Sequence, residues 1–180
     1  MRFGVTVAGV CNGSSNSSQT TLLTQADISI DGNNSIYVVD NGNRLLRFDQ
    51  NNRTARELRS FPTWPTFTFY ENRTGWIYTT VMTSHLVFIW PTNKTIPPNG
   101  LSNNNCSMNW LYYPSGIVVD SAGNTYISSY WCSWVTKWAP NATSGTLVAG
   151  QASGTPSGDT MSLYAPYNMV LDEANSFIYI

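Results

Sequence analysis

A strand-turn-strand phrase recurs along this chain of 180 residues, and its spacing constrains the fold more than any other feature. Each copy joins two β-branched or aromatic runs through a turn rich in Asp, Asn, Ser and Gly; the copies occupy residues 30–37, 69–78 (degenerate), 119–126 and 171–179. Spacings of 41, 48 and 53 residues separate the anchoring tyrosines, which are Tyr37, Tyr78, Tyr126 and Tyr179. A period in this range predicts a repeat architecture, not an enzyme with one buried active site.

Further landmarks keep the same register. An aromatic residue follows each of the first three tyrosines by eleven or twelve positions, and an asparagine comes three positions later: Phe48 with Asn51, Trp90 with Asn93, and Trp138 with Asn141. The segment 5–9 also matches 146–150 (Val-Ala-Gly in both), with glycines 141 residues apart, or three periods of 47. These independent matches indicate that the repeat is real.

Each period contains short β-branched and aromatic runs bounded by Gly, Asn, Asp and Ser, which is the pattern of strands joined by tight turns. The expected strands are 27–30, 36–39, 45–48, 86–90, 116–119, 125–128, 134–138 and the Val-Ala-Gly segments. No stretch of ten residues has a helical period. Four strands per unit of 40 to 50 residues predict an all-β fold, a partial β-propeller of about three to four antiparallel blades.

The segment 114–127, Pro-Ser-Gly-Ile-Val-Val-Asp-Ser-Ala-Gly-Asn-Thr-Tyr-Ile, resembles the core of an NHL repeat. Residues 36–45 are similar to the second half of that motif, and 138–150 resemble the linker between repeats in long secreted NHL proteins. The turn motif is replaced at 80–84 and at 129–133. The resemblance implies that the chain folds as an NHL β-propeller. It indicates little about function, because NHL motifs specify fold better than function.

The resemblance implies that residues 1–180 form one partial NHL β-propeller. Its repeats run roughly over 27–66, 67–113, 114–163 and a truncated 164–180, while 1–10 is the last strand of a preceding blade. We therefore expect a fragment, a partial gene product, or an arc that depends on neighbouring blades in a longer chain. The opening residues carry no signal peptide, and no run of 18 apolar residues predicts a membrane span.

The charge composition argues against nucleic acid as a partner. Charged residues make up only 11 % of the chain and the net charge is −1, so no field attracts polyanions. Five basic residues do cluster, interleaved with Asp49 and Glu57: Arg44, Arg47, Arg53, Arg56 and Arg59. We interpret them as a solvated third strand and its loop, in preference to a phosphate or RNA patch.

Two features favour an extracellular location. The first is eight Asn-x-Ser/Thr sequons, about twice the chance number, at Asn12, Asn16, Asn33, Asn52, Asn72, Asn93, Asn105 and Asn141. The alternative is Asn-rich turn chemistry that makes sequons by accident. The second feature is cysteine: Cys106 and Cys132 fall in connectors on one rim of the third repeat, so we expect a disulfide between them. Cys11 is expected to be free or bonded elsewhere.

The sequence offers few residues that could form a catalytic site. His85, the single histidine, is expected at the surface of a turn, and one histidine cannot build a three-histidine metal centre. The recurring Asp31, Asp120 and Asp172 each start a hairpin, where Asp accepts backbone N–H bonds. We therefore predict no enzyme activity, no metal and no cofactor in this chain.

Aromatic side chains are the remaining candidates for a binding surface. Trp90 and Trp138 repeat in register and are expected to pack between blades. A less regular group lies in connectors on the rim of the cysteines: Trp110, Tyr112, Tyr130 and Trp131. These residues either fill the core or bind a protein or glycan partner.

The sequence thus favours a non-catalytic extracellular binding or assembly module. A second reading is a fragment of a propeller enzyme, similar to amidating lyases or lactonases, whose catalytic and metal residues lie in other blades. A third is a cytoplasmic NHL domain that binds RNA or protein, which the neutral charge and the sequons disfavour.

Overall fold

The computed structural model describes residues 7–8, 22–50, 52, 54–97, 105–157 and 159–180. The described chain forms antiparallel sheets in sequence order, each a simple meander. The first sheet contains β1 (Gln25–Ile30), β2 (Ile36–Asp40), β3 (Arg44–Phe48) and β4 (Arg56–Ser60). The second contains β5 (Phe67–Glu71), β6 (Trp76–Val81), β7 (Leu86–Trp90) and β8 (Thr95–Ile96), with the short 3₁₀ helix η1 (Met82–Ser84) between β6 and β7.

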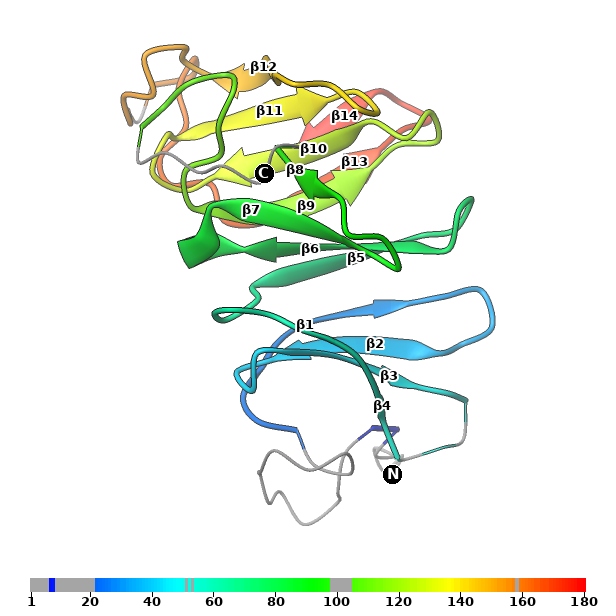
Figure 1. Cartoon of the computed structure of the whole chain (residues 1–180). Helices are drawn as coiled ribbons and strands as arrows, with labels where there is room; N and C mark the ends of the chain where they lie inside the picture. Colours follow the sequence, from blue (N-terminus) through cyan, green and yellow to red (C-terminus); the bar gives the residue numbers. More distant parts are fainter. Residues whose placement is uncertain (1–6, 9–21, 51, 53, 98–104, 158) are drawn as a thin grey trace, which may run out of the picture.

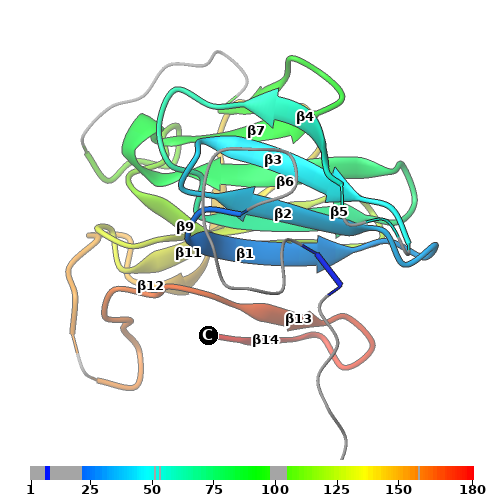
Figure 2. The same cartoon turned by 90° about the horizontal axis from the view of Figure 1, so that it is seen from below.

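The third sheet contains β9 (Pro114–Val119), β10 (Thr125–Ser129), β11 (Trp134–Trp138) and β12 (Thr146–Gly150). It is followed by a two-stranded sheet of β13 (Val170–Asp172) and β14 (Phe177–Tyr179). The sheets stack one upon the next (Figure 1). Their first strands β1, β5, β9 and β13 lie side by side (Figure 2). Residues of these four strands border a common hollow of about 340 Å³. This is the arrangement of propeller blades, so the predicted all-β, partial β-propeller fold is confirmed.

The predicted strands agree with the structure to within a few residues, and 86–90, 134–138 and 146–150 agree in full. Two outer strands were not predicted, β4 and β8. The Val-Ala-Gly match at 5–9 and most of the segment 1–10 lie outside the described residues, as does Cys11.

The recurring hairpins are held by the aspartates that start them. In the first copy, Asp31 Oδ1 accepts the N–H groups of Asn33 (2.9 Å) and Ser35 (2.8 Å), and the Tyr37 hydroxyl donates to Oδ2 (3.0 Å). Asp120 accepts the Asn124 N–H at 2.7 Å in the third blade. Asp172 repeats the pattern by accepting the Asn175 N–H (3.1 Å). The interpretation of these carboxylates as turn formers is confirmed.

Apolar side chains bury both faces of the blades. Successive residues of a strand point to opposite faces, so Ile117 and Val119 pack toward the second sheet while Val118 packs toward β13 and β14. Trp138 lies in the core between the second and third sheets, and Trp90 packs between the first and second. The predicted role of these two tryptophans is confirmed.

Polar side chains complete the contact between adjacent first strands, which do not pair through their backbones. Asp27 Oδ2 of β1 accepts the Thr68 N–H of β5 at 2.9 Å, and Ser29 Oγ accepts the Tyr70 N–H at 2.8 Å. Burial raises the pKa of Asp27, although the hydrogen bond from Thr68 opposes that shift. The first blade therefore supplies acceptors for the exposed ladder edge of the second.

The arginine cluster is only in part the solvated strand and loop that was expected: Arg56 is exposed, but Arg44 and Arg59 are engaged in the fold. Arg44 is buried and forms an ion pair with Asp40 (2.6 Å). Arg59 lies on β4, where its guanidinium stacks over the Phe88 ring at 4.7 Å and donates to the Thr92 carbonyl of the second sheet at 3.1 Å. These arginines are engaged in the fold because their stems and planar heads pack on neighbouring side chains. Arg53 lies outside the described residues.

Removing the Ile127 side chain will measure the strength of blade packing. Ile127 is fully buried between the second and third sheets, and Ile127→Ala is expected to lower the free energy of unfolding by about 2–5 kcal/mol. Ile28→Ala is the matched control, because Ile28 is 56 % exposed and should change stability by less than about 0.5 kcal/mol. Urea unfolding followed by circular dichroism provides the measurement, and equal losses in the two variants would contradict the stacked core.

Acid should weaken the third-blade hairpin through Asp120. Burial alone would raise the pKa of Asp120, but hydrogen bonds from Asn124 and Tyr126, with the nearby Lys137 ammonium, lower it overall. A carboxylate whose pKa is lower in the folded state stabilises the fold above the unfolded-state value of about 4 and loses that contribution as pH falls through the folded value. Asp120→Asn should therefore be less stable than wild type at pH 7, by about 1–2 kcal/mol, and the gap should close by pH 2.5. Urea midpoints at the two pH values test this; a constant gap would refute it.

Candidate binding face

Connectors that run from even-numbered to odd-numbered strands share one end of the antiparallel sheets, at the left in Figure 1. We call this end the loop face; its described residues are 41–43, 61–66, 82–85, 97, 105–113, 130–133 and 151–169 without 158. Hydroxyl groups tie the β4–β5 connector to η1: Thr83 donates to Thr63 Oγ1 at 2.7 Å, and Thr63 and Ser84 share a hydrogen bond of 3.1 Å. The connectors of different blades thus form one continuous surface.

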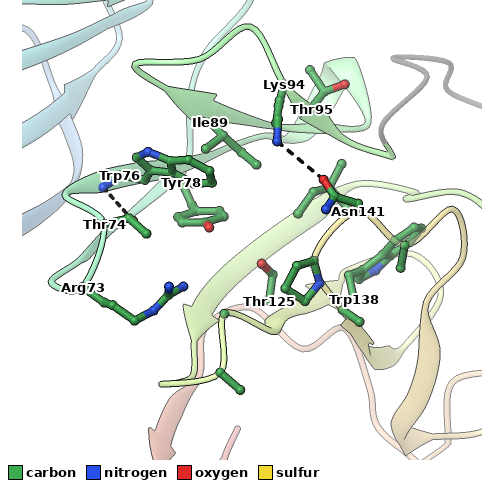
Figure 3. Close-up of a pocket in the computed structure, with 16 residues that line it drawn as sticks. Arg73, Thr74, Trp76, Tyr78, Ile89, Lys94, Thr95, Thr125, Trp138 and Asn141 are labelled. Atoms are coloured by element: carbon green, nitrogen blue, oxygen red, sulfur yellow. Dashed lines mark hydrogen bonds between the residues drawn. The ribbon is translucent and has the colours of Figure 1, made fainter.

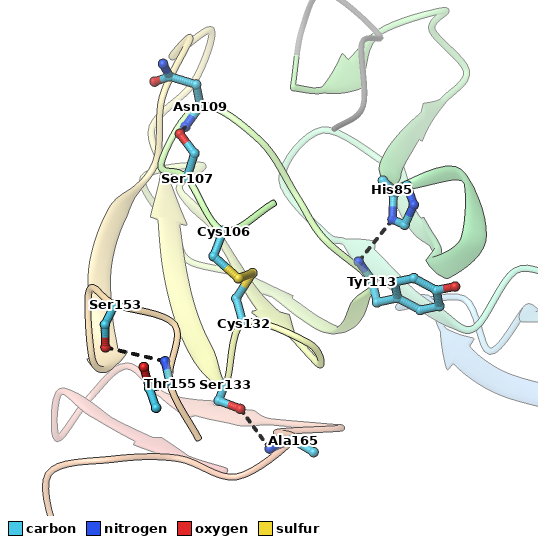
Figure 4. Close-up of a disulfide and its surroundings, with 10 residues drawn as sticks. All are labelled: His85, Cys106, Ser107, Asn109, Tyr113, Cys132, Ser133, Ser153, Thr155 and Ala165. Carbon is cyan, nitrogen blue, oxygen red and sulfur yellow. Dashed lines mark hydrogen bonds between the residues drawn. A yellow bond between two sulfur atoms is a disulfide. The ribbon is translucent and has the colours of Figure 1, made fainter. Parts of the chain in front are cut away.

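A disulfide fixes the third blade's part of the loop face. Cys106, in the connector before β9, is bonded to Cys132, in the β10–β11 turn, with a Cα–Cα distance of 5.4 Å (Figure 4). The predicted pairing is confirmed. Gly154 packs directly on it, since a Cβ there would lie 2.9 Å from Cys106 Sγ. Ser133 Oγ then accepts the Ala165 N–H (3.3 Å), which links this turn to the β12–β13 connector.

His85 is buried, so the expectation of a surface histidine is wrong. It follows η1 with φ 56°, in the left-handed region, and only 8 % of it is exposed. Its Nδ1 accepts the Tyr113 N–H at 3.1 Å, which joins the second blade to the connector entering the third. Tyr113 itself has φ 52°. The imidazole therefore positions a neighbouring loop whose backbone is already constrained.

Aromatic rings from four connectors contact one another in a continuous series that we call the aromatic ridge: His85, Tyr112, Tyr113, Trp131, Tyr130 and Tyr167. Centroid distances run from 4.9 Å for His85–Tyr113 to 6.4 Å for Tyr130–Tyr167, and most pairs are edge-to-face. Such geometry is favourable for aromatic quadrupoles. The ridge is therefore held by its own contacts before any partner arrives.

The structure brings together three of the four aromatic residues predicted to bind a partner, namely Tyr112, Tyr130 and Trp131. Trp110 is half-buried, and within the described part of the chain it makes no ring contact with them. Sequence reasoning assigned no binding role to His85, Tyr113 or Tyr167. The position of Tyr113 directly after Tyr112 could have indicated its role. Tyr167 lies 36 residues after Trp131, so its place in the ridge could not be read from a local pattern.

The residues of the aromatic ridge differ in their exposure to solvent. Trp131 is 55 % exposed and Tyr167 is 53 % exposed, whereas Tyr112, Tyr113 and Tyr130 are half-buried beneath them. Trp64 and Tyr164 add further exposed aromatic surface on the loop face. Rigid aromatic side chains that remain open to solvent can bury a large apolar area with little loss of side-chain entropy. The arrangement suits contact with a partner.

Within the described ranges, no group of three or more His, Cys, Asp or Glu side chains is placed to hold a metal ion. No described helix is long and apolar enough to cross a membrane. The six sequon asparagines in the described part are all exposed, at Asn33, Asn52, Asn72, Asn93, Asn105 and Asn141; Asn12 and Asn16 lie outside it.

No protein-family model and no curated protein matches this chain. Its fold does resemble solved structures. An auxiliary nutrient binding protein from Bacteroides thetaiotaomicron aligns with a TM-score of 0.62 and 15 % identity over 84 % of this chain and 44 % of that one. A chain of a nidogen/laminin complex aligns with a TM-score of 0.64 and 15 % identity, over 86 % and 55 %.

Virginiamycin B lyase from Staphylococcus aureus is also similar, with a TM-score of 0.56 and 12 % identity over 84 % of this chain and 47 % of the lyase. At these identities the likeness shows the fold, a propeller of repeated blades. The chain spans about half the length of the structures it matches.

Removing the disulfide should destabilise the third blade. The bond closes a loop with a sequence separation of 26, and loop-closure entropy for that length corresponds to about 3–4 kcal/mol. Cys106→Ala/Cys132→Ala is expected to lower the free energy of unfolding by that amount in urea titrations. Dithiothreitol should destabilise wild type similarly and leave the double variant unchanged. A reductant effect of equal size on both proteins would contradict this assignment.

Proposed function

We propose that this chain is a non-catalytic extracellular binding or assembly module built from NHL-type blades, and that the aromatic ridge binds a protein or glycan partner. The observation that carries the proposal is the ridge itself, in which the exposed Trp131 and Tyr167 stand on half-buried, mutually packed rings. Trp and Tyr dominate the energetics of protein interfaces, and their faces also stack on sugar rings.

The extracellular assignment rests on covalent chemistry and surface composition. The Cys106–Cys132 bond is typical of oxidising compartments. Exposed sequons on successive turns suit N-glycosylation in the secretory pathway. A net charge of −1 provides no attraction for nucleic acid, which argues against the RNA-binding alternative. The nutrient binding protein and the nidogen/laminin chain supply precedents for binding propellers.

An enzyme fragment is the second candidate, because a lyase shares this fold. Asp27 borders the central hollow of about 340 Å³, and burial raises its pKa, as is common for catalytic carboxyls. Under this reading, the remaining catalytic residues and any metal ligands belong to blades outside this sequence. Asp27 is already bonded to the Thr68 N–H, which favours its structural role in joining β1 to β5.

Truncation of the ridge tests the binding function. A printed glycan array and immobilised laminin serve as probes for the disulfide-bonded chain, and Trp131→Ala/Tyr112→Ala should reduce retention on the best probe about thirtyfold or more, as expected for interface hot spots. Phe177→Ala is the matched control, since Phe177 is an exposed aromatic residue at the start of β14, away from the loop face. Circular dichroism confirms that the variants fold. Equal retention of wild type, the double variant and the control variant would contradict the proposal.

A further inference from the structure

A second cavity lies at the opposite end of the blades from the loop face, between the second and third sheets (Figure 3). We call it the interblade cleft; its volume is about 390 Å³. That size falls within the range of small-molecule sites. Its floor is the buried core of Tyr78, Ile89 and Trp138, and its walls include the half-buried Trp76 and Ile96. The cleft therefore offers an apolar, largely aromatic interior.

Two cations flank the cleft, and no acidic side chain of the described residues lines it. Lys94 Nζ lies 5.6 Å from the Trp76 ring centroid and 3.5 Å from Asn141 Oδ1 of the third blade. The Arg73 guanidinium lies against the β9–β10 turn, where Gly123 has φ 84° and a Cβ would be 2.9 Å from Arg73 Nη2. Both cations thus bridge the two blades at the cleft, and together they favour an anionic group there.

Glu71 offsets part of the charge of Arg73 but does not line the cleft. This buried carboxylate accepts the N–H groups of Arg73 (2.7 Å) and Thr74 (3.1 Å) and the Thr74 hydroxyl, so it is occupied by its own turn. Its oxygen is 3.7 Å from Arg73 Nε, which leaves the outer guanidinium nitrogens directed at the cleft region.

Tyr78 supplies a polar group inside the cavity. Only 4 % of the residue is exposed, yet in the described part of the chain no side chain or backbone group is hydrogen-bonded to its hydroxyl, which points into the cleft in Figure 3. Burial, with a smaller contribution from the charge of Glu71, raises the pKa of Tyr78. The hydroxyl consequently remains a hydrogen-bond donor at neutral pH. The Thr125 hydroxyl lies across the cleft from it.

We propose that the interblade cleft binds a small aromatic acid. Its ring lies among Trp76, Ile89 and Trp138, its acid group contacts Lys94, and a polar substituent or acid oxygen accepts from the Tyr78 hydroxyl. The apolar walls favour an aromatic hydrocarbon ring over a sugar, which needs more hydrogen-bond partners than this cavity offers. This site is separate from the aromatic ridge and stands independently of the binding function proposed above.

Calorimetry on the 180-residue, non-glycosylated, disulfide-bonded chain tests the site with three probes: 2-naphthoate, the neutral 2-naphthamide and glucuronate. Naphthoate should bind saturably, and the amide should bind roughly tenfold more weakly because it lacks the charge that pairs with the cations. Glucuronate should bind more weakly than naphthoate. Equal affinity for acid and amide, preference for glucuronate, or absence of saturable binding to the folded chain would each overturn the proposal.

Variants assign the roles of the lining groups. Lys94→Gln should weaken naphthoate roughly tenfold and leave the amide unchanged, whereas Tyr78→Phe should weaken naphthoate roughly fivefold by removing one hydrogen bond. Arg56→Gln is the matched control, because Arg56 is an exposed cation on β4 of the first sheet. Circular dichroism verifies folding of each variant. If Arg56→Gln weakens naphthoate as much as Lys94→Gln does, the effect reflects net charge and the site is refuted.

Discussion

Mutual burial of the sheet faces is the constraint on which the structure depends. A single four-stranded meander of this composition has apolar side chains on both faces, as the alternation of Val38 and Val39 between two different core clusters illustrates. It cannot remove both faces from water alone, so it must be covered by a neighbour on each side. Stacking follows, and with it the convergence of connectors from several blades at one end. The aromatic ridge is a consequence of that convergence.

Polar contacts then fix how the stacked blades meet. The first strands approach without backbone pairing, and side chains such as Asp27 and Ser29 supply the missing acceptors. Where the third blade meets the segment before β13, Gly116 leaves no room for a side chain, since a Cβ would lie 2.8 Å from Asn168 Cα. Hydrophobic burial thus brings the blades together, and these local contacts determine their separation and orientation.

The sequence predicted the strands that local periodicity marks, and it missed the features that depend on contacts with a neighbouring blade. Strands such as 134–138 were found because aromatic and β-branched runs carry their own signal. Strand β4, Arg-Glu-Leu-Arg-Ser, was missed because its charged residues resemble a loop until Arg59 stacks on Phe88 of the next blade. His85 looked like a surface residue for the same reason: its burial depends on Tyr113, 28 positions away. The interblade cleft combines residues 50 positions apart, Arg73 and Gly123, and no local sequence pattern predicts that contact.

The bond between Cys106 and Cys132 also determines how the third blade would respond to mechanical tension. Force that enters along the chain from β8 passes through the sulfur atoms to β11 and bypasses β9 and β10, which lie inside the closed loop. With a sequence separation of 26 and about 3.3–3.6 Å per extended residue, roughly 90 Å of chain is withheld from stretching. The inner half of this blade, next to the axis, is thereby shielded from stretching.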